Sequence, residues 1–217
     1  MALTKYNFNS FDVTSAASKA LGFNSSANGF ATISPGSMTL IKTLTASSDS
    51  TLSFVDGSSS VVLDSTYPIY LFKYIDVHPA SDEVDFSVNF RDGGTDYDAT
   101  KSTTCFRAQH TEDDGTTDLS YKAGLDLAQS TAFLDIVDNV GNANYEGSSG
   151  TLHLFDPSNT TFVKHFLIVT SSSNYEDQIF NAHVAGYCNT TSAIDGVQFK
   201  MSSGNIDSGV IKMYGVV

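Results

Sequence analysis

Short runs in which apolar and polar residues alternate strictly constrain the fold of this chain more than any other sequence feature. The run Val84–Phe90 places an apolar residue at every second position, with a polar residue between each pair. Because successive side chains of a β-strand point to opposite faces, this pattern predicts a strand with one buried face. The run Ile69–Ile75 is apolar on both faces, which predicts a central strand covered on each side.

Similar runs recur along the rest of the chain, with turn residues between them. They cover residues 38–40, 52–54, 103–109, 152–155, 162–169, 180–188, 197–201 and 210–217. Most are separated by roughly ten residues or more, a spacing typical of β-sandwiches and barrels. The sequence therefore predicts an all-β, antiparallel β-sandwich over residues 38–217, preceded by an extended N-terminal arm over residues 1–37.

The arm is polar with scattered aromatic residues. Its one helical signal is Thr14–Leu21, which is followed by Gly22 and is too short to be stable alone. Exposed aromatic side chains in a polar segment need burial against a partner, so we expect Tyr6, Phe8 and Phe11 to anchor the arm at an interface.

Two glycine-containing segments predict β-hairpins, and one segment is ambiguous. The last two runs flank a Ser/Gly/Asn stretch in which Gly204 and Gly209 can take positive φ, so they predict a closing hairpin. Asp92–Gly94 gives a second hairpin signal. Leu125–Val140 fits helical spacing and equally two short strands; we favour strand because the surrounding pattern is β.

The charge of the chain is strongly acidic, with 24 acidic against 11 basic residues and a formal net charge of -13. Such a surface disfavours binding to nucleic acid and to anionic membranes. No apolar run of 18 residues is present, and the first residues lack a signal-peptide pattern, so we expect synthesis without export by that route. Cys105 and Cys188 are then expected to be buried free thiols rather than a disulfide.

No motif predicts catalysis. The chain lacks a G-x-S-x-G elbow and an H-E-x-x-H zinc motif, and His153, His165 and His183 fall in strand patterns, where a structural role is the commoner one. The carboxylates of Asp92, Asp96 and Asp98 could supply calcium ligands. The segment 112–115 is a second acidic candidate, but Asp/Gly-rich loops are more often solvated turns, the interpretation we favour for both.

Sugar binding commonly uses exposed aromatic platforms. The chain has no Trp, but four of its ten tyrosines, Tyr97, Tyr121, Tyr145 and Tyr175, fall in loop-like contexts. They are the candidate ligand-contact residues. The alternative for each is a tyrosine at the edge of the core with its hydroxyl in water.

The C-terminal stretch Ser202–Gly215 reads SSGNIDSGVIKMYG, and several internal stretches accompany it in a fixed order: Thr66–Phe72, Asp76–Ala80, Thr104–His110, Leu152–Pro157, Thr160–Phe166 and Ala185–Ile194. Together they resemble a family of small virion structural proteins of tailed phages that infect marine bacteria (cyanophage-like and pelagiphage-like). The resemblance spans about residues 38–217. It implies a jelly-roll-like sandwich on the outside of a virion, as a capsid decoration or part of a tail fibre or appendage, and it brings no catalytic residues.

From the residues and the resemblance we expect a non-enzymatic virion surface protein, synthesised in the host cytoplasm. Its expected partners are further copies in a homotrimer, capsid or tail proteins of the same virion, and a host surface glycan. The alternative function is a carbohydrate-binding module or host-surface adhesin.

Overall fold

The computed structural model describes residues 20–23, 26, 29–33 and 37–217, and the chain divides into two compact units, Met1–Thr39 and Leu40–Val217. In the first unit, β1 (Ala20–Phe23) pairs antiparallel with β2 (Phe30–Ile33). The rings of Phe23 and Phe30 stack across this pair, with centroids 5.3 Å apart.

Strand pairing replaces helix at the end of the helical segment expected in the arm. Ala20 and Leu21 belong to β1, so the prediction of helix is wrong there, because pairing with β2 outweighs a weak local preference. Residues 14–19 lie outside the described residues, as do Tyr6, Phe8 and Phe11.

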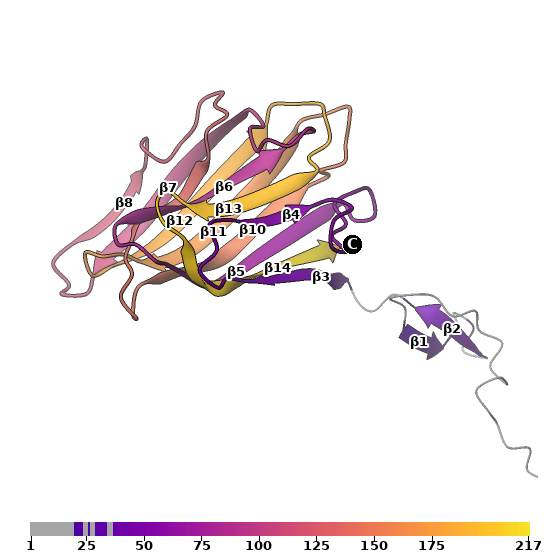
Figure 1. Ribbon diagram of the computed structural model, residues 1–217, viewed down its shortest axis with the longest axis horizontal. Coiled ribbons are helices and arrows are strands. Elements are labelled where there is room, and N and C mark those ends of the chain that lie inside the picture. The colour runs from indigo at the N-terminus through magenta and orange to yellow at the C-terminus, as the bar shows by residue number, and fades with distance from the viewer. Residues whose placement is uncertain (1–19, 24–25, 27–28, 34–36) are drawn as a thin grey trace, which may run out of the picture. The chain divides into compact units, whose positions relative to one another are not determined.

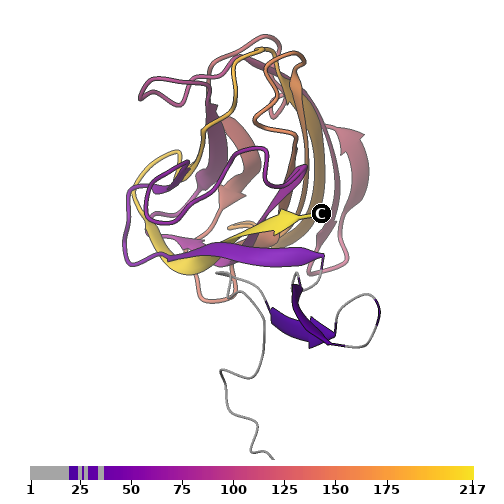
Figure 2. The ribbon, with the colours of Figure 1, turned by 90° about the vertical axis from the view of Figure 1, so that its right-hand side faces the viewer.

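The second unit is an antiparallel β-sandwich, which confirms the predicted fold class (Figures 1 and 2). An eight-stranded sheet has the order β3 (Met38–Thr45), β14 (Ile206–Val216), β5 (Ile69–Pro79), β10 (Gly147–Phe155), β11 (Lys164–Ser173), β12 (Gln178–Cys188), β7 (Lys101–Thr111) and β8 (Thr117–Tyr121). A four-stranded sheet has the order β4 (Leu52–Val55), β13 (Gly196–Met201), β6 (Val84–Arg91) and β9 (Leu134–Val140).

The pairing of early strands with late strands gives the connectivity of a jelly roll. β3 lies beside β14, β4 beside β13, β5 beside β10, and β6 beside β9. These four pairs form one long antiparallel ribbon that is rolled so that its successive segments alternate between the two sheets. β7 and β8 are inserted at the closed end of the ribbon and β11 and β12 in its side. The inserted strands all widen the larger sheet.

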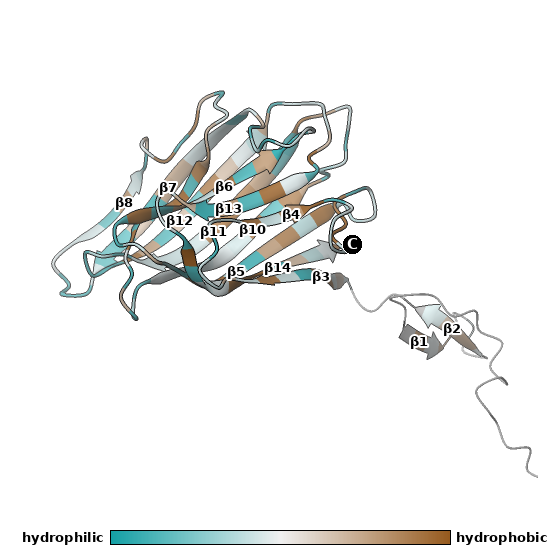
Figure 3. Ribbon diagram, in the orientation of Figure 1, coloured by the Kyte–Doolittle hydropathy of each residue, from teal (hydrophilic) through white to brown (hydrophobic). Residues whose placement is uncertain are grey.

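The alternation seen in the sequence places the apolar residues between the sheets. Figure 3 shows apolar and polar bands alternating along the strands. Phe199 of β13 lies at the centre of an aromatic cluster, with ring centroids 5.9 Å from Phe86 and 6.0 Å from Phe72. Phe72 contacts Phe54 edge to face at 5.3 Å. All four rings are fully buried, and each sheet contributes to the cluster, which ties the two layers together.

Polar contacts also connect the two sheets across the core. Lys101 of β7 is fully buried, and its ammonium donates hydrogen bonds to Asn89 Oδ1 of β6 at 2.7 Å and to the carbonyl of Ala99 at 3.1 Å. Removal from water lowers the pKa of Lys101 to about 8. Arg107 of β7 forms an ion pair with Asp138 of β9, which links the two sheets a second time.

The two cysteines are free and buried, as expected. Cys188 lies in register between Lys164 on one neighbouring strand and Lys101 on the other. Burial raises the pKa of Cys188 to about 12, although both lysines oppose that shift. The thiol is therefore protonated at neutral pH.

Both predicted hairpins are wrong, although the turns themselves are present. β13 and β14 belong to different sheets, and so do β6 and β7, so each turn is a crossover between layers. Gly204 has a φ of 71° and Gly93 a φ of 111°, the positive values that the sequence suggested. Hairpins and crossovers both need a turn between alternating runs, so the local pattern does not distinguish them.

The ambiguous segment Leu125–Val140 contains one strand rather than two. Its second half is β9, and residues 125–133 form an irregular connection. That connection is held beside β7, because Thr103 N–H bonds to the carbonyl of Leu127 and Lys101 and Ser130 exchange backbone hydrogen bonds. The apolar residues that fitted helical spacing therefore lie either in this connection or in β9.

Candidate functional site

The surface of the eight-stranded sheet that faces away from the four-stranded sheet is the broadest candidate for an interaction site. We call it the outer face. It consists of the odd-numbered residues of 69–75, 117–121, 149–155, 165–171 and 179–187, together with the even-numbered residues of 102–110 and 210–216. Their strand neighbours on the other side are largely buried in the core, except along the edge strand β8.

No position in these ranges holds Asp or Glu, although the chain contains 24 of them. Three carboxylate residues border the face, namely Asp76 beside Ser149, Asp114 beside His110 and Asp126 beside Tyr121. The only Lys, Arg or His residues there are two lysines and four histidines, namely Lys73, Lys212, His110, His153, His165 and His183. Seven of the fifteen exposed large apolar side chains among the described residues lie on this face. A surface without acid and rich in apolar groups is unusual in so acidic a chain, and such patches commonly mark interaction sites.

One row of this face runs in register across four neighbouring strands. Val169 of β11 pairs with His183 of β12, which pairs with Phe106 of β7, which pairs with Tyr121 of β8. The rings of His183 and Phe106 are parallel, with centroids 4.9 Å apart. The exposed side chains of the row therefore form one continuous surface.

A hollow of about 450 Å³ lies on the same face, between β10, β11, β12 and β7. Larger side chains, including those of Phe155 and Tyr187, surround the short residues Ala185 and Gly186. A Cβ atom on Gly186 would lie 2.5 Å from the ring of Phe166, so glycine lets that buried ring approach the sheet closely.

Loops gather at the end of the sandwich where β5, β11 and β7 finish. Tyr145 and Tyr175 both lie there. Asp177 raises the pKa of Tyr145 and the hydrogen bond to Glu176 raises that of Tyr175, and Asp82 makes a smaller contribution to each. Tyr121 lies elsewhere, on β8, where its hydroxyl donates to Asp126. Tyr97 lies beside Gly196, at the start of β13. The structure thus brings two of the four candidate tyrosines to one end and separates the others.

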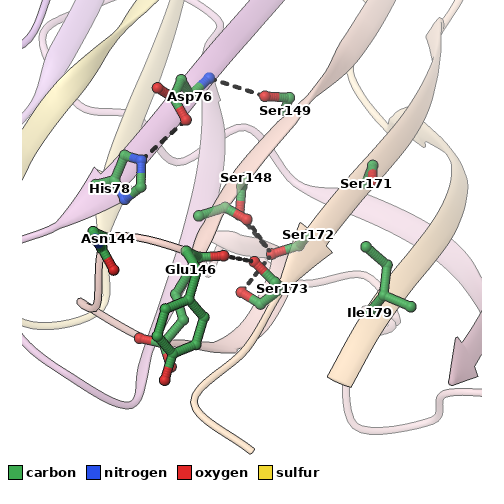
Figure 4. Close-up of a pocket in the computed structure, with 12 residues that line it drawn as sticks. Asp76, His78, Asn144, Glu146, Ser148, Ser149, Ser171, Ser172, Ser173 and Ile179 are labelled. Carbon is green, nitrogen blue, oxygen red and sulfur yellow. Dashed lines mark hydrogen bonds and ion pairs between the residues drawn. The ribbon is translucent and has the colours of Figure 1, made fainter. Parts of the chain in front are cut away.

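Tyr145 borders a polar pocket of about 200 Å³, which we call the Tyr145 pocket (Figure 4). Its lining residues come from the end of β5, from the loop before β10, and from the adjoining parts of β10, β11 and β12. They are Asp76, His78, Asn144, Tyr145, Glu146, Gly147, Ser148, Ser149, Ser171, Ser172, Ser173 and Ile179. The Tyr145 side chain is 61% exposed, so its ring is accessible.

A β-bulge in β5 shapes one wall of this pocket. The register with β10 shifts between Ser148 and Gly150, opposite Asp76, which has a φ of 52°. Asp76 N–H donates to Ser149 Oγ at 2.9 Å, and its carboxylate lies 3.0 Å from the imidazole of His78. A bulge re-aims side chains, and a positive φ at a non-glycine residue is uncommon, so this wall is a specific local structure.

Hydrogen bonds fix the floor and the opposite wall. The hydroxyls of Ser148 and Ser172 are 2.8 Å apart and buried, and Ser172 also donates to the carbonyl of Gly147 at 3.0 Å. Ser173 Oγ donates to the carbonyl of Tyr145 at 2.8 Å. Because these serines are small and already bonded, the floor is both hollow and rigid.

The pocket has an acidic electrostatic character. The carboxylates of Asp177 and then Glu146 raise the pKa of Tyr145. Glu146 is 5% exposed, and one of its oxygens accepts the N–H of Ala143 at 2.6 Å. Among the described residues, no serine hydroxyl hydrogen-bonds to His78, so Asp76 and His78 are not part of a nucleophilic triad in this geometry.

Sequence reasoning found Tyr145 but missed the rest of the pocket. Asp76, His78 and the serines lie far apart in the sequence and meet only through the pairing of β5, β10 and β11. One usable signal was present: Ser171–Ser173 places three short polar residues after the apolar run Phe166–Val169.

The acidic loops do not assemble a metal site. Within residues 20–23, 26, 29–33 and 37–217, no three His, Cys, Asp or Glu side chains gather closely enough to hold a metal ion. Asp92, Asp96 and Asp98 therefore do not come together as calcium ligands. Asp113 instead accepts the N–H of Gly115 at 2.9 Å, a local turn interaction.

In the part of the chain that the structure describes, no helix combines the length and the apolar character that a membrane crossing requires. Comparisons of the chain with protein-family models, with curated proteins and with solved structures find no match.

Proposed function

We propose that this chain is a non-enzymatic structural protein of the surface of a tailed-phage virion, where it decorates the capsid or forms part of a tail fibre or appendage. The jelly-roll connectivity supports this proposal, since jelly rolls recur in viral capsid and lectin domains. The family resemblance of residues 38–217 points the same way. Fold alone does not determine function, so the proposal needs a surface suited to assembly.

The acid-free outer face is the observation that carries the proposal. Copies of a chain with a net charge of -13 repel one another over most of their surface. The outer face adds no carboxylate of its own strands to that repulsion and offers exposed apolar groups such as Phe106, Leu167 and Val169. It is therefore the surface on which a neighbouring protein can pack at the lowest electrostatic cost.

We assign the outer face to contacts with other copies of the chain, in a closed homotrimer. Closed cyclic assemblies bury faces and sheet edges that a monomer leaves exposed. Light scattering on the purified chain checks this assignment. A mass equal to one chain at micromolar concentration would reject the trimer.

The arm is assigned to attachment on the particle. Residues 40–217 form a compact unit, so deletion of residues 1–34, including Tyr6, Phe8 and Phe11, should leave the sandwich folded while attachment is lost. Full occupancy of the truncated chain on its particle would reject this role.

The decisive experiment is to locate the chain by cryo-electron microscopy of the intact particle. Regular density on the capsid lattice would make it a decoration protein, and density at the tail alone would make it a tail component. Absence from any particle would reject the virion proposal.

A second function, a carbohydrate-binding module or host-surface adhesin, is favoured by one separate observation. The Tyr145 pocket combines an exposed aromatic ring with carboxylate and hydroxyl groups at one loop-rich end. A soluble adhesin would keep this pocket without any association with a particle.

A further inference from the structure

We infer that the Tyr145 pocket binds a single neutral pyranose ring of a surface glycan. The inference does not depend on where the chain lies in a virion, because it rests on the pocket. It does require that Ser149, Ser171 and Ile179, which belong to both the pocket and the outer face, lie outside the contact between copies. It holds for a tail component and for a soluble adhesin.

The size of the pocket limits the ligand. Its volume is about 200 Å³, below the roughly 300–1,000 Å³ typical of pockets for drug-sized ligands. A pocket of this size suits one ring of a sugar, with the rest of the glycan outside.

The chemistry of the lining matches a ring that has one apolar face and a hydroxylated rim. The Tyr145 ring is exposed and offers a π face to the C–H groups of a sugar ring. Asp76, whose side chain is 81% exposed, can accept hydrogen bonds from sugar hydroxyls through the carboxylate oxygen that does not contact His78. Ser171 and Asn144 add polar groups that make no hydrogen bond of their own among the described residues.

The charge of the pocket selects against acidic sugars. Asp76 and Glu146 line it, and Asp177 lies close enough to affect Tyr145. A carboxylate or sulfate on the ligand would meet these groups at short range, which disfavours binding. A neutral sugar instead donates its hydroxyl protons to them.

The pocket is organised before any ligand arrives. Ser173 holds the backbone of Tyr145, Ser149 holds the backbone of Asp76, and the Ser148–Ser172 contact is buried. A site that needs little rearrangement loses less entropy on binding. One ring in an open pocket still makes few contacts, so we expect a Kd of the order of 1 mM per ring.

Saturation-transfer NMR on the full chain tests the inference. The probes are the methyl glycosides of glucose, galactose, mannose and N-acetylglucosamine, with glucuronic acid as the acidic comparison. We expect transfer to at least one neutral glycoside and at least fivefold weaker transfer to glucuronic acid. No transfer to any neutral glycoside at 10 mM would overturn the inference.

Variants then test whether the sugar binds in the Tyr145 pocket. Tyr145→Ala should abolish the transfer, Tyr145→Phe should keep it, and Tyr175→Ala, which changes a tyrosine outside the pocket lining, should leave it unchanged. Ser171→Phe fills the pocket from an exposed strand position and gives a second loss variant if Tyr145→Ala fails to fold. Transfer that persists in both loss variants would place the sugar elsewhere and reject this site. Failure of the virion proposal would appear in the cryo-electron microscopy instead and would leave these results unaffected.

Discussion

Phe106 and His183 stack face to face on the outer face, with ring centroids 4.9 Å apart and ring planes within 1° of parallel. They lie directly opposite each other in the pairing of β7 with β12. An aromatic pair of this kind on an exposed strand surface covers little core, so its position favours contact with another molecule rather than stabilisation of the monomer.

The first prediction concerns that surface. Phe106→Glu places a carboxylate on the acid-free outer face and should convert the expected trimer to monomers in light scattering. The fold should survive with a loss of about 1 kcal/mol in unfolding free energy, since Phe106 is 48% exposed. Thr95→Glu adds the same charge in an exposed loop off this face and should leave the mass unchanged. Equal masses for both variants would show that the outer face is not the interface.

The second prediction concerns the buried Lys101–Asn89 contact. Asn89→Leu removes the acceptor and leaves a buried ammonium with one carbonyl partner, so unfolding free energy should fall by about 3 kcal/mol. Lys101→Met replaces the ammonium with an apolar side chain of similar length and should be much less damaging, or stabilising. Urea unfolding of both variants measures the difference. A larger loss in Lys101→Met than in Asn89→Leu would contradict this account.

The third prediction follows from the pKa of Lys101, which is lowered from 10.5 to about 8 in the folded chain. Between these values the unfolded chain binds a proton that the folded chain does not. Stability due to this group therefore rises with pH through that window and is lowest below pH 8. The unfolding free energy of the wild type relative to Lys101→Met should increase from pH 8 to pH 10. A difference that is flat across this range would mean that the ammonium is not desolvated as described.

The fourth prediction separates backbone strain from steric contact at two glycines. Gly209 has a φ of 119°, and a Cβ atom there would lie 2.6 Å from the carbonyl oxygen of Asp76. Gly57 has a φ of 73° with nothing within 4 Å of its Cβ position. Gly57→Ala should cost about 1 kcal/mol and Gly209→Ala about 3 kcal/mol, because only the second adds a backbone clash. Thermal unfolding reports both, and equal costs would exclude the clash.

The fifth prediction concerns the thiols. Burial raises the pKa of Cys105 and of Cys188, so the folded chain should react very slowly with a disulfide reagent at pH 8. Two thiols should react at once in denaturant. Rapid labelling of one thiol in the folded chain would show that a strand around it opens locally.

The strands could be predicted from the sequence because alternation is a local property. In Val84–Phe90 and in Ile69–Ile75 the order of apolar and polar residues itself indicates which side chains are buried, and both runs are strands. Which sheet a strand joins is not local. The turn at Gly204 looks the same whether the next strand pairs with β13 or crosses to β5, and the structure shows the crossover.

The candidate surfaces were predictable only in part for the same reason. Alternation indicates that His153 and His165 point away from the core, but only the strand order shows that they belong to one acid-free surface. Tyr145 stood out as a loop tyrosine. Its partner Asp76 did not, because the bulge that presents Asp76 depends on the pairing of β5 with strands more than 70 residues away.

The place of β14 has a consequence for how the chain is made. β14 follows every other strand of the sandwich in the sequence, yet it fills the gap between β3, the first strand of the sandwich, and β5. Until residues 206–216 are synthesised, the edges of both neighbours lack their partner, and the rolled ribbon cannot close. Contacts between strands so far apart in the sequence also form slowly. The nascent chain therefore passes through an interval with exposed strand edges, in which aggregation competes with folding. The yield of folded protein then depends on how quickly β14 is synthesised and paired.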